Sequence, residues 1–205
     1  MCWICGTLHP LIRVVDAFDT VVAEARQCNV CQGLPLGPKP IFQMHASARI
    51  LLVGQAPGRL THAKGLPFDD VSGDRLRLWM GISRETFYNP TFIACLPMGF
   101  CYPGKAKGGD LPPRKECAPR WRPRLLPLLP NITLTLLIGQ FAQVWHHPGD
   151  GRNLTRRVRD WNGENTIPLP HPSPRNGIWL KANPWFETDV LPMLRDKVQM
   201  TLHDQ

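Results

Sequence analysis

The spacing of apolar residues changes several times along this chain and predicts where helices and strands alternate. Between residues 11 and 26 the apolar residues recur at helical spacing, which predicts an amphipathic helix. Short, continuous apolar runs suit strands that are buried on both faces, as in a parallel sheet. Four such strands are predicted, at 49–54, 91–96, 133–139 and 166–169.

Further helices are predicted between and after these strands, at 73–80, from 113–115 onward, at 140–145 and at 184–200. Ser72 is the expected N-cap of the first of them. Stretches rich in glycine, proline or polar residues predict loops at 33–40, 54–70, 97–113 and 146–165. Because strands alternate with helices, we expect a three-layer α/β/α fold with a central four-stranded parallel sheet.

The alternation runs through the whole chain, without an internal repeat. With 205 residues, the chain is long enough for one sizeable core and short for two. We therefore predict a single domain over 1–205, in which 1–10 form an N-terminal extension. Ligands of such sheets bind at the carboxyl ends of the strands. The loops after Gly54, Leu96 and Leu169 are thus where we expect the chemistry.

The charge of the chain suggests a partner. There are 24 Lys and Arg residues against 16 Asp and Glu, which gives a net charge of +8. A basic bias of this size favours an anionic partner, most commonly nucleic acid. No run of about 18 apolar residues is present, and no basic leader precedes the first apolar stretch. We expect a cytoplasmic monomer without a membrane span.

Cysteines point to a metal site. Of the seven present, four form the C-x-x-C pairs Cys2/Cys5 and Cys28/Cys31. An odd number in a chain of this size argues against a disulfide framework. In a cytoplasmic protein such pairs bind metal or perform redox chemistry, and we expect metal binding here.

Two loops carry distinctive sequences. Gly54-Gln55-Ala56-Pro57-Gly58, the first-motif loop, follows the first predicted strand, and His171-Pro172-Ser173-Pro174-Arg175-Asn176, the H-P-S loop, follows the last. A parallel sheet brings both loops to one edge. Together they resemble the motifs of the uracil-DNA glycosylase superfamily, and the resemblance extends from about Leu11 to Lys197.

Three further features resemble the iron–sulfur branches of that superfamily, families 4 and 5. Cys28/Cys31 precede the first-motif loop, Gly65-Leu66-Pro67-Phe68 matches an aromatic segment, and 15 residues separate Cys101 from Cys117. The resemblance implies a monofunctional enzyme that hydrolyses the N-glycosidic bond of uracil, or of another deaminated base, in single- or double-stranded DNA. Its product would be an abasic site, the start of base-excision repair.

The resemblance also implies how the base is bound. Backbone amides of Gln55 and Ala56, beside Gly54, would face the pyrimidine together with the His171 side chain. These groups would stabilise the negative charge of the departing base. Phe68 would stack on the base after the base has flipped out of the DNA double helix.

Two positions depart from the family pattern. Ala56 stands where some branches have an acidic or amide side chain, so we expect Asp70, with Asp69 in reserve, to activate the attacking water. The second strand lacks the asparagine with which many relatives read the base. Asn176 of the H-P-S loop, or backbone groups near Met98, are the candidate substitutes, and Ser173 is a further candidate for binding the substrate.

The implied cofactor is a 4Fe-4S cluster, which commonly uses four cysteine thiolates, here Cys28, Cys31, Cys101 and Cys117. The alternative is zinc held by Cys2, Cys5, Cys28 and Cys31. The 22 residues between these two pairs exceed the 15–20 that are usual for zinc ribbons, and most of them belong to a predicted helix.

Phosphate contacts are expected from basic residues in the loops, of which the candidates are Lys105, Lys107, Arg156, Arg157 and Arg175. Several such contacts would give DNA affinity that depends on salt and not on sequence. A second hypothesis is a non-catalytic nucleic-acid-binding protein with a structural metal site, which Ala56 and the missing asparagine leave open.

Overall fold

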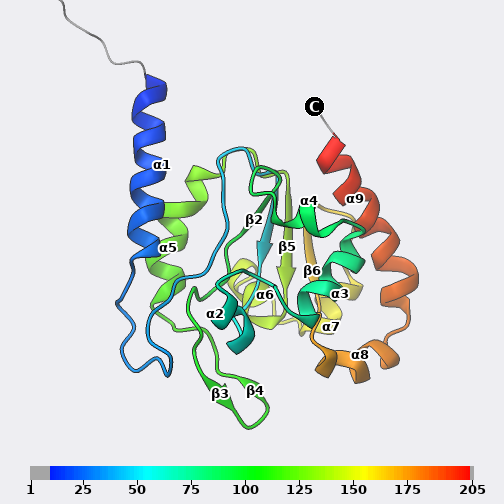
Figure 1. The fold of residues 1–205 in the computed structure, drawn as a ribbon. Helices are drawn as coiled ribbons and strands as arrows, with labels where there is room; N and C mark the ends of the chain where they lie inside the picture. The colour runs from blue at the N-terminus through cyan, green and yellow to red at the C-terminus, as the bar shows by residue number, and fades with distance from the viewer. Residues whose placement is uncertain (1–9, 204–205) are drawn as a thin grey trace, which may run out of the picture.

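The computed structural model describes the backbone of residues 10–203 and the side chains from Phe18 onward. Its centre is a sheet of four parallel strands in the order β2-β1-β5-β6 (Figure 1). The strands are β1 (Ile50–Val53), β2 (Ile93–Cys95), β5 (Leu134–Ile138) and β6 (Thr166–Leu169). Helices lie on both faces, so the predicted three-layer α/β/α fold is confirmed.

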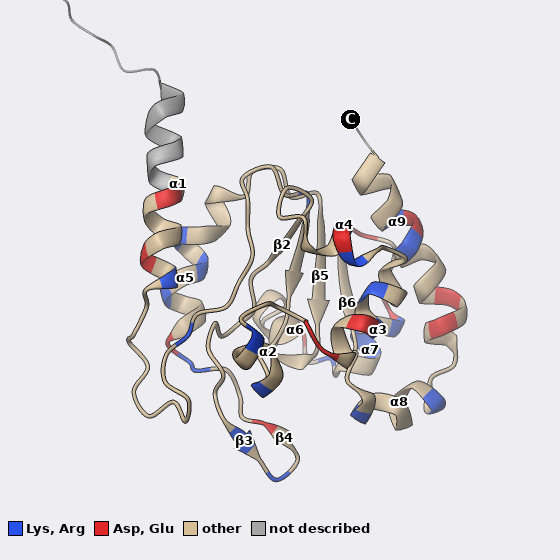
Figure 2. Cartoon of the chain, in the orientation of Figure 1, with Lys and Arg blue, Asp and Glu red and all other residues tan. Residues whose placement is uncertain are grey.

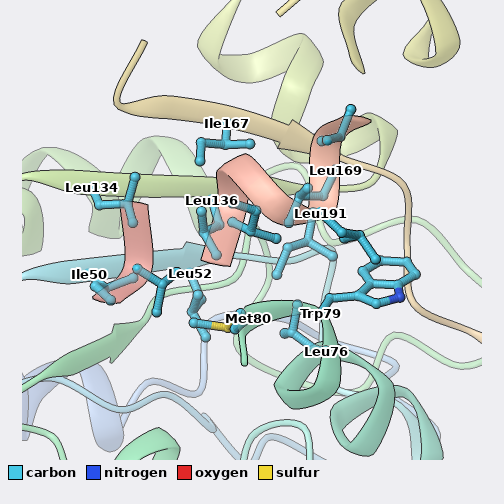
Figure 3. Close-up of a cluster of buried hydrophobic side chains, with 14 of the residues drawn as sticks. Ile50, Leu52, Leu76, Trp79, Met80, Leu134, Leu136, Ile167, Leu169 and Leu191 are labelled. Carbon is cyan, nitrogen blue, oxygen red and sulfur yellow. The ribbon is translucent and has the colours of Figure 1, made fainter. Parts of the chain in front are cut away.

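The continuous apolar runs have a simple cause, because successive side chains of a strand point to opposite faces of the sheet. Ile50 and Leu52 of β1 belong to one buried cluster, whereas Leu51 and Val53 belong to another on the opposite face. Figure 3 shows the first cluster, in which the strand side chains pack against Trp79 and other helical residues. Each strand is therefore apolar along its whole length.

The helices divide between the two faces. The cluster of Figure 3 is covered by α3 (Val71–Met80), α7 (Leu154–Arg159), a π-helical turn (Phe186–Val190) and α9 (Leu191–His203). The opposite face is covered by α1 (Pro10–Arg26), α5 (Cys117–Leu125) and α6 (Gln140–His146). Within the described chain, no helix has both the length and the apolar character needed to cross a membrane.

Short elements fill the connections at the carboxyl edge of the sheet. They are the helices α2 (Arg59–Lys64) and α8 (Gly177–Ala182) and the hairpin of β3 (Lys105–Ala106) and β4 (Gly109–Asp110), whereas α4 (Arg84–Tyr88) leads into β2 at the opposite edge. The hairpin, α2 and α7 lie in segments that we predicted as loops, and α4 and α8 were not predicted. Two-residue strands leave no apolar run to detect, and the arginines of α7 mask its apolar positions.

Two predicted helix starts are wrong. The N-cap of α3 is Asp70, not Ser72, because the Asp70 carboxylate accepts a hydrogen bond from the Gly73 N–H at 2.9 Å. Helix α5 begins at Cys117, later than the predicted 113–115. The predicted helix at 184–200 is divided, since its first part is the π-helical turn before α9.

Candidate active site

A cavity of about 370 Å³ lies at the carboxyl edge of the sheet. It is lined by the first-motif loop after β1, by Pro97 after β2 and by the H-P-S loop after β6. In the strand order, β1 lies beside β5, and the chain proceeds from this pair in opposite directions to β2 and β6. Such a switch point leaves a crevice between neighbouring loops, which is where α/β sheets bind ligands.

The first-motif loop is held by its carbonyl groups. Gly54 accepts a hydrogen bond from the Met98 N–H at 2.8 Å, and Gln55 accepts one from the Gly99 N–H at 2.9 Å. Among the described residues, the N–H groups of Gln55 and Ala56 have no such partner. The loop therefore lines the cavity with two backbone donors that have no protein partner within the described chain.

Phe68 also lines the cavity, and its backbone is unusual. Its φ of 54° is the positive value that side chains rarely adopt. Two glycines make room for it: a Cβ at Gly54 would lie 3.2 Å from the Phe68 ring, and one at Gly73 would lie 1.7 Å from the Phe68 carbonyl oxygen. The ring packs edge-on against Phe87 at 6.2 Å between centroids. The position of the Phe68 ring over Gly54 is therefore fixed by these contacts.

His171 enters the cavity from the loop after β6. Its Nδ1 accepts a hydrogen bond from the Ser173 N–H at 3.1 Å, so the proton of a neutral ring lies on Nε2. Burial lowers the pKa of His171, although the negative charge of Asp70 raises it in part. The ring is therefore neutral at pH 7 and has an N–H group to donate to a ligand.

The two other H-P-S loop candidates differ in position. Ser173 lines the cavity, and its hydroxyl accepts a hydrogen bond from the Arg175 N–H. Asn176 is not among the lining residues, and its side-chain amide donates to the His171 carbonyl at 2.7 Å. The structure thus gives Asn176 a part in positioning His171 and does not support the predicted contact with the base. Among the described residues that line the cavity, none is an asparagine.

The two candidate aspartates are separated by the structure. Asp69 forms ion pairs with Lys64 at 3.2 Å and Arg84 at 2.8 Å, and it does not line the cavity. These partners lower the pKa of Asp69, chiefly through the hydrogen bond from Arg84. Asp70 does line the cavity while it caps α3. Of the two, only Asp70 has access to a ligand there.

The β3–β4 hairpin brings a second acidic residue, Asp110, to the cavity beside Asp70. The sequence prediction missed it because it belongs to none of the recognised motifs. The sequence feature that could have indicated it is the polar, glycine-rich run between Cys101 and Cys117, which we predicted to be an irregular loop. Figure 2 shows acidic positions on β4 and in the loop before α3.

The four predicted cluster ligands, Cys28, Cys31, Cys101 and Cys117, line one small pocket, the cysteine pocket. Cys28 and Cys31 lie in the segment just after α1, Cys101 lies in the segment after β2, and Cys117 is at the start of α5. The Phe100 N–H donates to the Cys117 sulfur and the Trp121 indole N–H to the Cys28 sulfur, both at 3.3 Å. Cys2 and Cys5, the other half of the zinc alternative, lie outside the described residues.

The chemistry of this donor set suits either kind of metal centre, since zinc and 4Fe-4S clusters both bind sets of four cysteine thiolates. Within the described residues, no group of three His, Cys, Asp or Glu side chains is placed to hold a metal ion. Burial raises the pKa of Cys117 to about 12, so binding would require loss of its proton.

Of the predicted phosphate contacts, Lys105, Lys107 and Arg156 are exposed, and Arg175 lines the cavity. Arg157 is different, because its side chain is buried and forms a two-point contact with Asp150. The structure does not support Arg157 as a contact for DNA. Figure 2 shows basic positions on α2, β3 and near α8, around the carboxyl edge.

The fold and the cavity define a three-layer α/β protein with a ligand site at the carboxyl edge of its sheet. A family model described as the uracil DNA glycosylase superfamily matches residues 42–195. The chain belongs to this superfamily. A type-4 uracil-DNA glycosylase from Saccharolobus solfataricus is 30% identical over 88 residues, which cover 40% of this chain and 41% of that relative. The chain is thus similar to the type-4 branch over less than half of each protein.

Proposed function

We propose that this protein is a monofunctional glycosylase that removes uracil from DNA and leaves an abasic site. The observation that carries the proposal is the convergence of His171, the amides of Gln55 and Ala56, and Phe68 on one cavity. An aromatic face holds a flipped base, while preorganised donors stabilise the charge that develops as the base leaves. Membership of the superfamily supports the same reaction.

In the proposed reaction, the C1′–N1 bond breaks and its electron pair stays on the base. The negative charge spreads to the pyrimidine O2, where the Nε2–H of His171 and the two backbone amides donate hydrogen bonds. Because the ring of His171 is neutral, it stabilises the leaving base without first taking up a proton. Asp70 contributes a negative charge that stabilises the cationic sugar.

The absence of asparagine among the described lining residues bears on base choice. An asparagine side chain matches the N3–H and O4 edge of uracil with one acceptor and one donor. Without it, we propose uracil as the main substrate, with hypoxanthine and xanthine as further substrates of the same cavity. DNA would be held through phosphate contacts from Arg175, Lys105, Lys107 and Arg156.

A 4Fe-4S cluster on Cys28, Cys31, Cys101 and Cys117 is part of the proposal. When bound, it would supply covalent crosslinks between α1, the segment after β2 and α5, and so would be structural. The N–H groups that donate to two of the sulfurs support this assignment, because such bonds are typical around cluster thiolates. Brown protein with about four irons per chain is expected; colourless protein with one zinc would contradict the assignment.

The test is a panel of oligonucleotides with uracil, hypoxanthine, xanthine or thymine, each single-stranded and paired. We expect alkali-labile breaks at uracil and none at thymine. Binding of all these oligonucleotides without cleavage of any would favour the second hypothesis, a nucleic-acid-binding protein without activity.

A further inference from the structure

The β3–β4 hairpin is fixed to both motif loops of the cavity. The Gln55 side-chain amide donates to the Leu111 carbonyl at 2.9 Å, and the Arg175 guanidinium donates to the Gly108 carbonyl at 3.4 Å. These contacts lie on either side of Asp110 in the chain. The hairpin is therefore docked in one orientation, with Asp110 between the first-motif loop and the H-P-S loop.

Asp110 lines the cavity, and its carboxylate lies beside Gly58 of the first-motif loop. A Cβ at Gly58 would lie 3.4 Å from the Asp110 Oδ2 atom, which is van der Waals contact. Asp110 is an exposed residue, so water can reach it. The charged groups that act on it are Arg175, Lys105, which pairs with it across the hairpin, and Asp70.

This environment suits a proton acceptor. Partial burial raises the pKa of Asp110, and Asp70 raises it further, while Arg175 and Lys105 lower it. A carboxylate with a raised pKa is a stronger base and takes up a proton more readily. By contrast, the Asp70 carboxylate is engaged by the Gly73 N–H at the start of α3.

We infer that Asp110 is a further catalytic residue, which accepts a proton from the water that attacks the sugar. The inference rests on the proposed glycosylase function. It gives the reaction the acceptor that Ala56 lacks, and it leaves Asp70 to stabilise the cationic sugar.

The water oxygen forms a bond to C1′ as the C1′–N1 bond breaks, and the bonding electron pair leaves with the base. One water proton passes to the Asp110 carboxylate, and the hydroxyl group remains on C1′ of the abasic site. The proton then leaves Asp110 and neutralises the base anion through solvent.

The test compares Asp110→Asn with wild type in single-turnover cleavage of uracil DNA and in equilibrium DNA binding. We expect the cleavage rate to fall by about 100-fold or more, the range for loss of a general base. Binding should stay equal or tighten, because a negative charge near the phosphates is removed. Glu187→Gln, which removes an exposed carboxylate from the π-helical turn before α9, is the matched control and should cleave at the wild-type rate.

Two further measurements separate chemistry from structure. The wild-type rate should rise with pH through the pKa of Asp110 and then level off, and this rise should be missing in Asp110→Asn. Added formate should restore part of the rate in Asp110→Ala, because it returns a carboxylate to the space that the Asp110 side chain leaves. It should not restore the rate in His171→Ala.

The outcomes distinguish the inference from the function on which it rests. Cleavage by wild type with an unchanged rate in Asp110→Asn would overturn the inference alone. Tighter DNA binding without a slower rate would show that Asp110 merely offsets Arg175 and Lys105. A wild-type protein that releases no base from any oligonucleotide would overturn both.

Discussion

The cavity and the cysteine pocket are both assembled from distant segments near the carboxyl edge of the sheet, yet their polar groups are used differently. In the cavity, the amides of Gln55 and Ala56 and the Nε2 of His171 have no protein partner among the described residues. In the cysteine pocket, the sulfurs of Cys28 and Cys117 already accept hydrogen bonds. Donors without a protein partner are free to bind a ligand, whereas paired groups hold their segments together. This difference supports the proposed chemistry in the cavity and the proposed structural role of the cysteine pocket.

The largest effect is expected from the cysteine pocket. Cys117→Ala should abolish the brown colour and lower the unfolding temperature by about 10 °C or more, equivalent to roughly 3–5 kcal/mol. The reason is that Cys117 is the proposed ligand that links α5, through the cluster, to the segments with the other three cysteines. Visible absorbance and thermal unfolding measure this. Cys95→Ala is the control, because this thiol is buried in β2 away from the other cysteines, and it should keep the colour.

The next largest effect should be confined to catalysis. His171→Ala should slow single-turnover cleavage about 100- to 1,000-fold, as loss of an oxyanion donor does elsewhere, with little change in stability. His45→Ala changes an exposed histidine that is distant from His171 in the sequence. This variant should cleave at the wild-type rate. Since burial lowers the pKa of His171, the rate should not change as pH passes the usual histidine pKa. A rate that tracks that value would contradict a neutral His171.

Asp70 is the N-cap of α3 and is also proposed to act in catalysis, so two substitutions should separate these two roles. Asp70→Ser keeps an N-cap acceptor for α3, whereas Asp70→Ala loses it and should cost about 1 kcal/mol of stability. Both remove the negative charge near the sugar and should slow cleavage by a similar factor, about 10-fold. Unfolding in denaturant and single-turnover cleavage measure the two effects. Wild-type cleavage by the serine variant would show that Asp70 serves only as a cap.

The smallest effects are expected from two neighbouring arginines of α7. Arg156→Ala should weaken DNA binding a few-fold. It should also lower the slope of log affinity against log salt concentration by the amount expected for about one phosphate contact, without loss of stability. Arg157→Ala should leave DNA binding unchanged and lower stability, because it removes the partner of Asp150.

The pH dependence of the second variant has a definite sign. Arg157 holds the pKa of Asp150 well below its usual range, chiefly through its hydrogen bond. The pair therefore stabilises the fold above the unfolded-state pKa of aspartate and loses this contribution as pH falls through the folded-state pKa. The stability difference between wild type and Arg157→Ala should shrink on acidification; a difference that grows would contradict the ion pair.

The fold was largely predictable because its strands are buried on both faces. Each strand then appears as an unbroken apolar run, as in Leu134 to Ile138, and the glycines and prolines between runs mark the loops. Helix α7 and the β3–β4 hairpin were not predictable in this way. Their stability depends on contacts such as Asn153 with the Arg156 N–H and Gln55 with the Leu111 carbonyl, which periodicity does not reveal.

The candidate site was predictable where residues belong to a motif and not where they depend on tertiary contacts. His171 and Phe68 lie at the cavity as the motifs implied. Asn176 also belongs to a motif, but its amide turns back to the His171 carbonyl, a contact set by the path of the loop. Asp110 reaches the cavity only because the hairpin docks on two other loops, and no local pattern encodes that docking.

The measurement that tests the central claim most directly is the release of free base from a single-stranded oligonucleotide with labelled uracil at one position. The account predicts free uracil and an equal amount of abasic site in a strand that stays intact until alkali is added, and no release by His171→Ala. Bound oligonucleotide with all of its uracil retained would contradict the account, because the cavity would then hold DNA without cutting its glycosidic bond.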